Sequence, residues 1–396
     1  MTRNKIHLLT GILLTALFTA SCTVKELDET TDDEFIQKSH TVIVFMPWSS
    51  NLLPYFQQNV NDMAKAIKEK QLRESRVVVV QSISPSETDM TELYYTNNIC
   101  QRKKLLSYPH ADFTRQETIT AMLDDVRRLS PTPYYSMIVS SHGMGWLPVA
   151  ATADSNINSM RTCMHYDETE EPLTRWFGGV TADFQIETTT LAKAIRDADM
   201  YMDYILFDNC YMSSVEVAYD LKETTDYVIA SPTEILIYGF PYYQCTEYLT
   251  GTPNYASLCD SFIRFYETYQ YPSGTIAVTD CRELDGLAEI YRKIIREYSS
   301  KEESPNPQVM DGYSPAVFFD LGDYVTRICK DEGLLKAFTR QLDKTVPHKG
   351  HTPEFFSSVS KDYCPISSYS GLTTSAPSRS EYMRYYQATA WYQATY

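Results

Sequence analysis

Apolar and polar residues follow one another along the chain in a pattern that predicts strands and helices in turn. The apolar runs with the length of buried strands span residues 41–46, 76–83, 137–141, 204–207, 227–230 and 275–279. The segments with apolar residues at helical spacing lie near residues 54–70, 117–129, 191–195, 213–222, 255–269 and 283–300. This alternation favours an α/β fold with a mostly parallel sheet covered by helices on both faces.

Two of the apolar runs stop abruptly at a reactive side chain. The run that begins at Met137 leads to His142, and the run that begins at Asp203 leads to Asp208 and Cys210. Open α/β sheets bind ligands just beyond the carboxyl ends of their strands, so we expect the imidazole and the thiol to share one sheet edge. A single buried cysteine is usually inert. A thiol paired with a histidine, however, is a candidate nucleophile and base.

The residues around these two strand ends resemble the clostripain family of cysteine peptidases, which belongs to the caspase-like clan. The resemblance rests on Ser141-His142-Gly143-x-Gly145-Trp146 and on Phe207-Asp208-x-Cys210, followed by Val215-Glu216-Val-Ala. Residues 41–63 and 369–392 are similar to the first strand and helix and to the C-terminal end of the family. The resemblance therefore covers most of the chain after residue 40. It implies a caspase-like fold with a C-terminal extension.

For catalysis, the resemblance implies that Cys210 is the nucleophile and His142 the base, with no third catalytic residue required. A reactive thiol must be largely thiolate, which a nearby cation or a helix N-terminus favours. The imidazolium of His142 and the helix expected from Ser213 would supply both. The oxyanion formed on attack needs N–H donors, for which the backbone amides of Gly143 and Cys210 are the natural candidates.

Substrate preference is expected to depend on carboxylates near the thiol. Asp208 lies two residues before Cys210 and therefore on the same face of the strand end. Its carboxylate could cap a turn or a helix, or it could recognise a basic side chain; the resemblance implies a preference for Arg or Lys before the cleaved bond. Glu234, after the next predicted strand, is a second candidate for this pocket. Cleavage after aspartate is disfavoured by the acidic chain and by Asp208.

A long segment with little periodicity, residues 143–187, separates His142 from the next expected helix. Loops of this length in compact domains are usually functional or disordered. The resemblance implies self-cleavage between the histidine and the cysteine, at a site similar to the sequence around Arg175 and Trp176. The Arg175–Trp176 bond is the expected cut, and Arg161–Thr162 is the alternative. Trp176 departs from the small residues usual after the cut. The alternative is therefore that the loop is ordered and is not cleaved.

The N-terminus has the anatomy of an export signal. Arg3 and Lys5 precede an apolar stretch, residues 8–20, that is too short for an ordinary membrane span. Cys22 follows Thr19-Ala20-Ser21 in a sequence that resembles a bacterial lipoprotein signal, although leucine is more usual at Thr19. A plain signal peptide is the alternative. We expect a signal peptide over residues 1–21, acylation of Cys22, and an acidic flexible tether over residues 22–40. The mature protein would be a membrane-anchored lipoprotein, periplasmic or on the cell surface.

Composition narrows the range of partners. The 396 residues are 43% hydrophobic and 22% charged, which supplies ample material for a core. The formal net charge of −16 argues against nucleic acid as a partner and would attract a cationic substrate. The nine cysteines have neither metal-type spacing nor the density of a disulfide framework, and most are expected to be buried. No cofactor and no metal site is expected, and dependence on calcium is left open.

The polar, proline-containing stretch at residues 301–308 marks the predicted internal boundary. It divides a catalytic domain over residues 41–300 from a C-terminal region over residues 301–396, expected to pack on it and to hold helices near residues 321–330 and 381–392. Two functions remain. The chain is either a cysteine endopeptidase that acts on proteins or peptides with exposed Arg or Lys, or a catalytically silent surface lipoprotein that uses the fold for binding. The presence of both His142 and Cys210 favours the peptidase.

Overall fold

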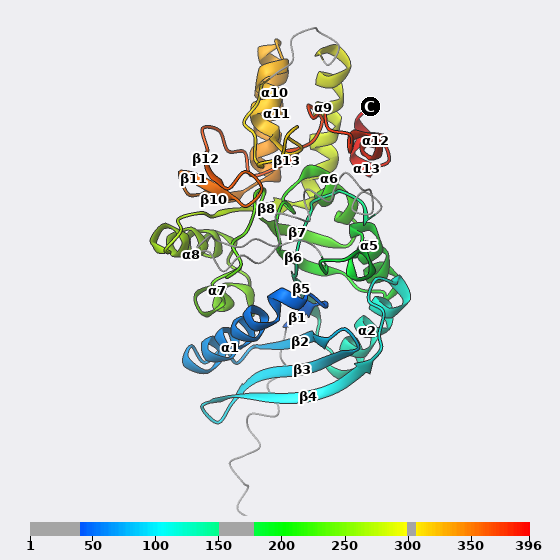
Figure 1. Ribbon diagram of the computed structural model, residues 1–396, viewed down its shortest axis with the longest axis vertical. Coiled ribbons are helices and arrows are strands. Elements are labelled where there is room, and N and C mark those ends of the chain that lie inside the picture. Colours follow the sequence, from blue (N-terminus) through cyan, green and yellow to red (C-terminus); the bar gives the residue numbers. More distant parts are fainter. Residues whose placement is uncertain (1–39, 150–177, 299–305) are drawn as a thin grey trace, which may run out of the picture. The chain divides into compact units, whose positions relative to one another are not determined.

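A nine-stranded sheet organises the part of the chain that the computed structural model describes, residues 40–149, 178–298 and 306–396 (Figure 1). Its strand order is β10-β8-β7-β6-β5-β1-β2-β3-β4. The strands are β1 His40–Met46, β2 Ser75–Ser84, β3 Glu87–Thr96, β4 Ile99–Pro109, β5 Tyr134–Ser140, β6 Met202–Asp208, β7 Thr225–Ala230, β8 Thr275–Asp280 and β10 His348–His351. The five central strands β2, β1, β5, β6 and β7 are parallel, and the outer strands pair antiparallel.

Helices cover both faces of this sheet, which confirms the predicted caspase-like α/β fold (Figure 1). One face carries α1 Leu53–Glu69, α7 Tyr242–Leu249 and α8 Tyr255–Thr268. The other carries α2 Gln116–Leu129, α5 Thr188–Asp197 and α6 Val215–Leu221.

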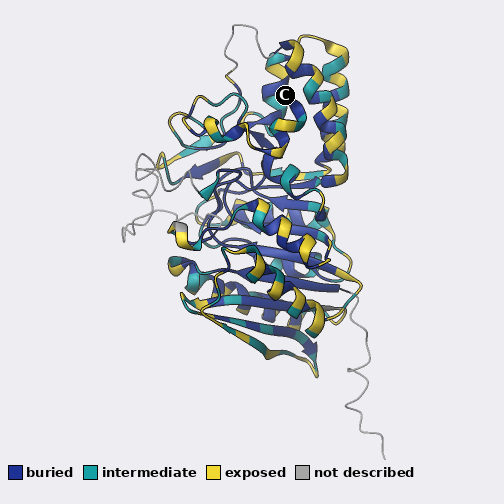
Figure 2. Ribbon diagram, turned by 90° about the vertical axis from the view of Figure 1, so that its right-hand side faces the viewer, coloured by how far each residue is buried: buried dark blue, intermediate teal, exposed yellow. Residues whose placement is uncertain are grey.

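Strand β1 shows why the sheet needs both layers. Val42 and Val44 pack in one core with α1, whereas Ile43 and Phe45 pack in the other with α2, because successive side chains of a strand point to opposite faces. All seven β1 residues are buried, and the central strands are the most deeply buried part of the fold (Figure 2). A strand that is covered on both faces is a continuous apolar run in the sequence, so β1 could be predicted from the sequence alone.

The chain between β2 and α2 forms a hairpin of β3 and β4. Asn97 and Asn98 form its turn with φ of 48° and 62°. Two successive residues with positive φ match the backbone twist of paired strands, and asparagine tolerates this conformation better than most residues.

The C-terminal part holds more structure than the sequence indicated. The helix expected near residues 283–300 is present as α9 Leu284–Tyr298, before this part. The helices of the C-terminal part are α10 Leu321–Ile328, α11 Glu332–Thr345, α12 Met383–Tyr386 and α13 Ala390–Thr395, and its short strands are β9 Phe319–Asp320, β11 Glu354–Ser357, β12 Asp362–Pro365 and β13 Thr373–Thr374. The single helix expected over residues 381–392 is wrong. Helix α12 ends at Tyr386, and Thr389, whose backbone is extended, begins α13 by accepting a hydrogen bond from Tyr392 N (3.2 Å) on its hydroxyl.

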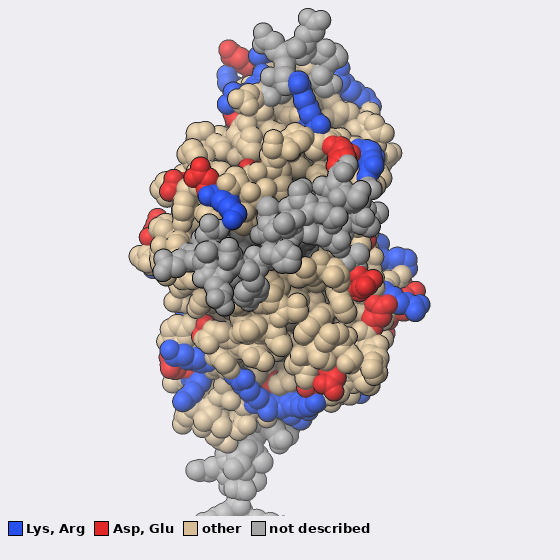
Figure 3. Space-filling model, viewed as in Figure 1, with Lys and Arg blue, Asp and Glu red and all other residues tan. Residues whose placement is uncertain are grey.

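Charged side chains of both signs lie mostly near the edges of the face seen in Figure 3. Several form exposed pairs, among them Lys104 with Asp89 (2.9 Å) and Lys193 with Asp197 (2.8 Å). Exposed pairs of this kind contribute roughly 0.2–1 kcal/mol each, so packing decides the fold. Within the described ranges, no helix is long and apolar enough to cross a membrane.

His40, at the start of β1, gives the fold a dependence on pH. The side chain is 1% exposed, and its Nε2 lies 2.8 Å from Ser136 Oγ on β5. Burial lowers the pKa of His40 to about 4. An unfolded histidine titrates near pH 6.5, so the unfolded state binds more protons between pH 6.5 and 4, and the free energy of unfolding falls as pH falls through this window.

We therefore expect wild type to lose roughly 2–3 kcal/mol of stability between pH 7 and pH 4.5 that His40→Gln does not lose. Urea unfolding of both proteins at the two pH values measures this difference, and the contributions of all other groups cancel in the comparison. Equal losses in wild type and variant would show that His40 does not control acid stability.

Candidate active site

The register of two parallel strands brings His142 and Cys210 to one edge of the sheet. Ser140 of β5 pairs with Asp208 of β6, and each candidate residue lies two positions beyond that pair. Both side chains are 1% exposed. An ideal Cβ on Gly143 would lie 2.5 Å from the Cys210 carbonyl oxygen, so only glycine allows the two loops to approach this closely. The structure thus brings together the three residues that the sequence selected.

The imidazole of His142 is oriented by a residue from a third strand end. Its Nε2 lies 2.9 Å from Oδ1 of Asn51, in the short helix η2 Ser50–Leu52 that follows β1. An amide oxygen only accepts hydrogen bonds, so this contact assigns the proton to Nε2 and leaves Nδ1 as the basic nitrogen.

No role at the site was predicted for Asn51 from the sequence. A polar residue just beyond the end of β1 was the available signal, because β1 is the neighbour of β5 in the sheet.

The thiol of Cys210 lies in a turn whose backbone is strained. Ile235 N donates to Sγ at 3.3 Å, and Sγ lies 3.7 Å from the Ile235 carbonyl oxygen. Tyr211, the next residue, has a φ of 60°, which non-glycine residues rarely adopt. Its ring stacks on Phe318 at 4.9 Å, and its hydroxyl donates to Glu234 (2.7 Å). These contacts hold the turn, and strain of this kind is common at functional sites.

Hydrogen bonds lock the two loops against each other. Asn209 Nδ2 donates to Ser141 Oγ (2.8 Å) and to the His142 carbonyl oxygen (3.0 Å). Gly178 N donates to the same Ser141 hydroxyl (2.7 Å), and His142 N donates to the Gly178 carbonyl oxygen (3.3 Å). The backbone on either side of the candidate base is therefore fixed by neighbours from β6 and from the chain that leads into α5.

Asp208 is fully buried beside the nucleophile. Its Oδ1 accepts from Phe240 N (3.1 Å), and its Oδ2 accepts from Tyr242 Oη (3.0 Å) and Ser140 Oγ (3.2 Å). Phe240 and Tyr242 lead into α7, so the carboxylate joins the ends of β5 and β6 to the loop after β7.

Glu234 lies on the other side of the nucleophile turn, next to Tyr211. Besides Tyr211, it accepts hydrogen bonds from Ser357 Oγ (2.7 Å), from Ser358 N (3.1 Å) and from Ser358 Oγ (2.6 Å). The carboxylate thus holds the C-terminal region against the loop of Cys210.

Glu216 and Trp146 of the two motifs meet at Ser375. Ser375 N donates to Glu216 Oε1 (3.1 Å), and Trp146 Nε1 donates to Ser375 Oγ (2.7 Å). Burial raises the pKa of Glu216 to about 7. Trp146 also packs edge-on against Tyr386 at 5.4 Å, so the structure uses it for packing. This contact fixes the loop after His142 to α6, the helix that follows Cys210.

The other described cysteines differ from Cys210 in their surroundings. Cys245, Cys259, Cys281 and Cys329 are buried, Cys100 and Cys364 are partly exposed, and no disulfide joins any cysteine within the described residues. Burial raises the pKa of the Cys245 and Cys259 thiols to about 12, which keeps them protonated and inert. None of them follows a central strand next to a histidine.

Several residues selected from the sequence lie outside the described ranges, namely Cys22, Arg161, Arg175 and Trp176. The chain is described again from Gly178, three residues after the expected cut. Among the residues described, no group of three or more His, Cys, Asp or Glu side chains is arranged to hold a metal ion.

The fold and this strand-end pair place the protein in the class of caspase-like cysteine peptidases. The sequence profile of the clostripain family matches residues 44–391, and the chain belongs to this family. The resemblance inferred from the sequence is thereby confirmed. A comparison with curated proteins finds no significant match.

Solved structures of the family resemble this one. A secreted C11 cysteine protease from Bacteroides thetaiotaomicron, iotapain, is 42% identical with a TM-score of 0.82, covering 91% of this chain and 99% of its own. An inactive zymogen of a C11 protease from Parabacteroides distasonis is 26% identical with a TM-score of 0.76, covering 90% and 98%. A clostripain from Bacteroides thetaiotaomicron in complex with the peptide inhibitor BTN-VLTK-AOMK is 48% identical with a TM-score of 0.54, covering 56% and 99%.

Proposed function

We propose that the protein is an endopeptidase that cleaves after lysine or arginine, with Cys210 as nucleophile and His142 as general base. The observation that carries the proposal is the placement of both residues two positions beyond the Ser140–Asp208 pair of adjacent strands. The alternative, a silent binding protein, would not require a thiol and an oriented imidazole at the same sheet edge.

In the proposed reaction, Nδ1 of His142 takes the proton of the Cys210 thiol, and the thiolate attacks the carbonyl carbon of the scissile bond. The N–H groups of Gly143 and Cys210 stabilise the oxyanion that forms. An ideal Cβ on Gly143 would lie 3.0 Å from Cys210 N, so the two donor residues adjoin.

The C–N bond then breaks, and the imidazolium donates its proton to the leaving amine. His142 next removes a proton from water, and the resulting hydroxide attacks the thioester. The C–S bond breaks, and the thiolate leaves and recovers its proton.

Two observations support a basic residue before the cleaved bond. Asp208 places a buried carboxylate two residues before the nucleophile. The inhibitor bound to the related clostripain ends its peptide in lysine, directly before the AOMK group. Of the two candidate carboxylates, Asp208 is favoured, because it lies at the end of the strand that leads to Cys210, only two residues before the nucleophile, whereas Glu234 joins the nucleophile turn to two serines of the C-terminal region.

Peptide substrates that differ only in the residue before the scissile bond test the proposal. We expect turnover with lysine or arginine, little with leucine or aspartate, and none in Cys210→Ala. A purified protein that cleaves none of these peptides, even after limited treatment with trypsin to open an uncut chain, would favour the silent binding protein.

Self-cleavage of the Arg175–Trp176 bond is part of the proposal. It is supported by the basic residue at this position and by the inactive zymogen known for a relative. We expect wild type to contain a fragment that starts at Trp176, whereas Cys210→Ala and Arg175→Ala remain uncut at this bond. Intact mass and N-terminal sequencing measure this. A single intact chain with full activity would show that no cut is needed, and a fragment starting at Thr162 would move the site to Arg161.

We also propose that Cys22 is acylated and anchors the mature enzyme, which fits the secreted character of the related iotapain. One acyl chain holds only marginally, but two or more hold firmly. The native protein should therefore fractionate with membranes, and Cys22→Ala should release it. Native protein that is entirely soluble, with an N-terminus other than residue 22, would contradict the anchor.

A further inference from the structure

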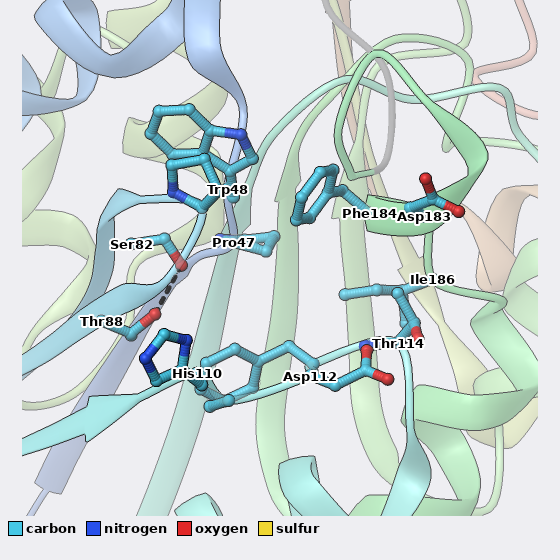
Figure 4. A pocket seen from close by; sticks show the side chains of 13 residues that line it. Pro47, Trp48, Ser82, Thr88, His110, Asp112, Thr114, Asp183, Phe184 and Ile186 are labelled. Carbon is cyan, nitrogen blue, oxygen red and sulfur yellow. Dashed lines mark hydrogen bonds between the residues drawn. The ribbon is translucent and has the colours of Figure 1, made fainter.

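A pocket of about 390 Å³ lies on the same sheet edge as the active site but beyond β1 (Figure 4). Its walls come from the residues after β1, from β2 and β3, from the segment after β4 and from η4 Ala182–Phe184. Trp48 and Phe184 lie on either side of Pro47, Asp112 lies on the wall with Thr114, and Asp183 lies beyond Phe184 on η4 (Figure 4). The catalytic step described above uses none of these residues.

The pocket adjoins the candidate base through short contacts. Ser49, the residue after Trp48, donates its hydroxyl to the Gly178 carbonyl oxygen (3.0 Å), which also accepts His142 N (3.3 Å). Asn51, which orients the imidazole, lies three residues after Trp48. On the other wall, Phe184 packs against Gly179, where an ideal Cβ would lie 2.5 Å from the Phe184 Cβ. One wall of the pocket is thus continuous with the loop that holds His142.

The order of the strands relates this pocket to the direction of the substrate. The sheet runs β6-β5-β1-β2, with Cys210 after β6, His142 after β5 and the pocket after β1 and β2. The leaving amine takes its proton from His142, so it must lie on the side of the thiol that faces His142. The chain that continues from this amine therefore heads across β5 toward β1, away from Asp208 and α7.

We propose that this pocket is a subsite for a basic side chain of the substrate on the carboxyl-terminal side of the scissile bond. The inference rests on the proposed peptidase function and adds a second determinant of specificity to it.

The chemistry of the walls favours a guanidinium over other side chains. The indole of Trp48 and the ring of Phe184 offer faces for stacking, and a planar guanidinium stacks on aromatic rings while it pairs with carboxylates. Oδ1 of Asp112 accepts from Thr114 N (3.0 Å) and Thr114 Oγ1 (2.6 Å), which orients the carboxylate and leaves Oδ2 for a ligand. Asp183 contributes a second, exposed carboxylate from η4, and no lysine or arginine lines the pocket among the described residues.

Internally quenched peptides test this proposal on the mature enzyme. All carry Val-Leu-Thr-Lys before the scissile bond, and Arg, Ala, Glu or Leu is placed in turn at each of the first three positions after it. We expect Arg at one of these positions to raise kcat/KM about fivefold over Ala and Glu to lower it, as for a partly exposed cation that pairs with a carboxylate and stacks on an aromatic face. Equal rates for all four residues, or a preference for Leu or Glu, would overturn the proposal.

Two variants locate the effect. In Asp112→Asn/Asp183→Asn, the ratio of kcat/KM for the Arg and Ala peptides should fall to about one. The matched surface variant Asp343→Asn, on α11, should keep the wild-type ratio. An unchanged ratio in the double variant would assign the preference to another surface. The circular dichroism and unfolding temperature of each variant exclude misfolding, and the ratio does not depend on the amount of active enzyme.

A coumarin amide of Val-Leu-Thr-Lys separates this proposal from the proposed function. It carries no residue after the scissile bond, so wild type must cleave it if the enzyme cuts after lysine, whatever the pocket binds. Cleavage of the coumarin amide without any preference among the longer peptides would overturn the subsite alone. No cleavage of either kind of substrate would overturn the peptidase and the subsite together.

Discussion

His142→Ala is expected to lower kcat at least about a hundredfold on a lysyl peptide, because the Cys210 thiol loses its base and the leaving amine loses its acid. The imidazole is buried and held at 2.9 Å from Asn51 Oδ1, so solvent cannot replace it in the same geometry. Steady-state kinetics on an active-site-titrated enzyme measure the loss. His348→Ala, a histidine substitution at the far edge of the sheet, is the control and should keep wild-type turnover.

Two substitutions of Asn51, with different expected losses of kcat, test the same assignment of His142. Asn51→Ala removes the acceptor that fixes the imidazole tautomer, so kcat should fall by on the order of tenfold. Asn51→Asp keeps an acceptor oxygen at the same place and should recover most of that loss. If alanine and aspartate reduced kcat equally while both variants unfolded at the wild-type temperature, Asn51 would not position the base. If His142→Ala kept more than a tenth of the wild-type kcat, His142 would not be the base.

Asp208→Asn should remove most of the preference for lysine and arginine. Losing one partner of a buried charge pair costs about 2–5 kcal/mol, which corresponds to roughly thirtyfold or more in kcat/KM. Asparagine is isosteric, and its Oδ1 can still accept from Phe240 N and so preserve the loop after β7. Kinetics on Lys, Arg and norleucine peptides measure the change in selectivity.

Glu234→Gln is the comparison for this substitution, since Glu234 is the other candidate carboxylate. We expect it to affect stability more than selectivity, because its oxygens bind Ser357, Ser358 and Tyr211. A loss of selectivity in Glu234→Gln with unchanged selectivity in Asp208→Asn would exchange the two assignments.

The sequence was most informative where structure is local. Strands β5 and β6 are buried on both faces and therefore appear as uninterrupted apolar runs, so the residues that end them, His142 and Cys210, could be selected without coordinates. Because parallel strands present their carboxyl ends at one edge of a sheet, the sequence also predicted that these two residues lie close together.

Contacts between distant parts of the chain were beyond such reasoning. The partner of His142 lies 91 residues away at Asn51, and the donors to Glu234 lie 123 and 124 residues away at Ser357 and Ser358. Periodicity indicates which face of an element is buried but not which polar side chains will meet. The pocket next to Trp48 is likewise assembled from the ends of four strands and from η4, so no single stretch of sequence predicts it.

The most direct test of the central claim is covalent labelling of the mature enzyme with a lysyl peptide acyloxymethyl ketone, followed by peptide mapping. We expect one label per active enzyme, located on Cys210, and no label on Cys210→Ala. Cys364→Ala, which removes a partly exposed thiol, is the matched control and should be labelled as wild type is. Labelling of Cys210→Ala at the wild-type rate, or a label on another cysteine, would contradict the assignment of Cys210 as the nucleophile.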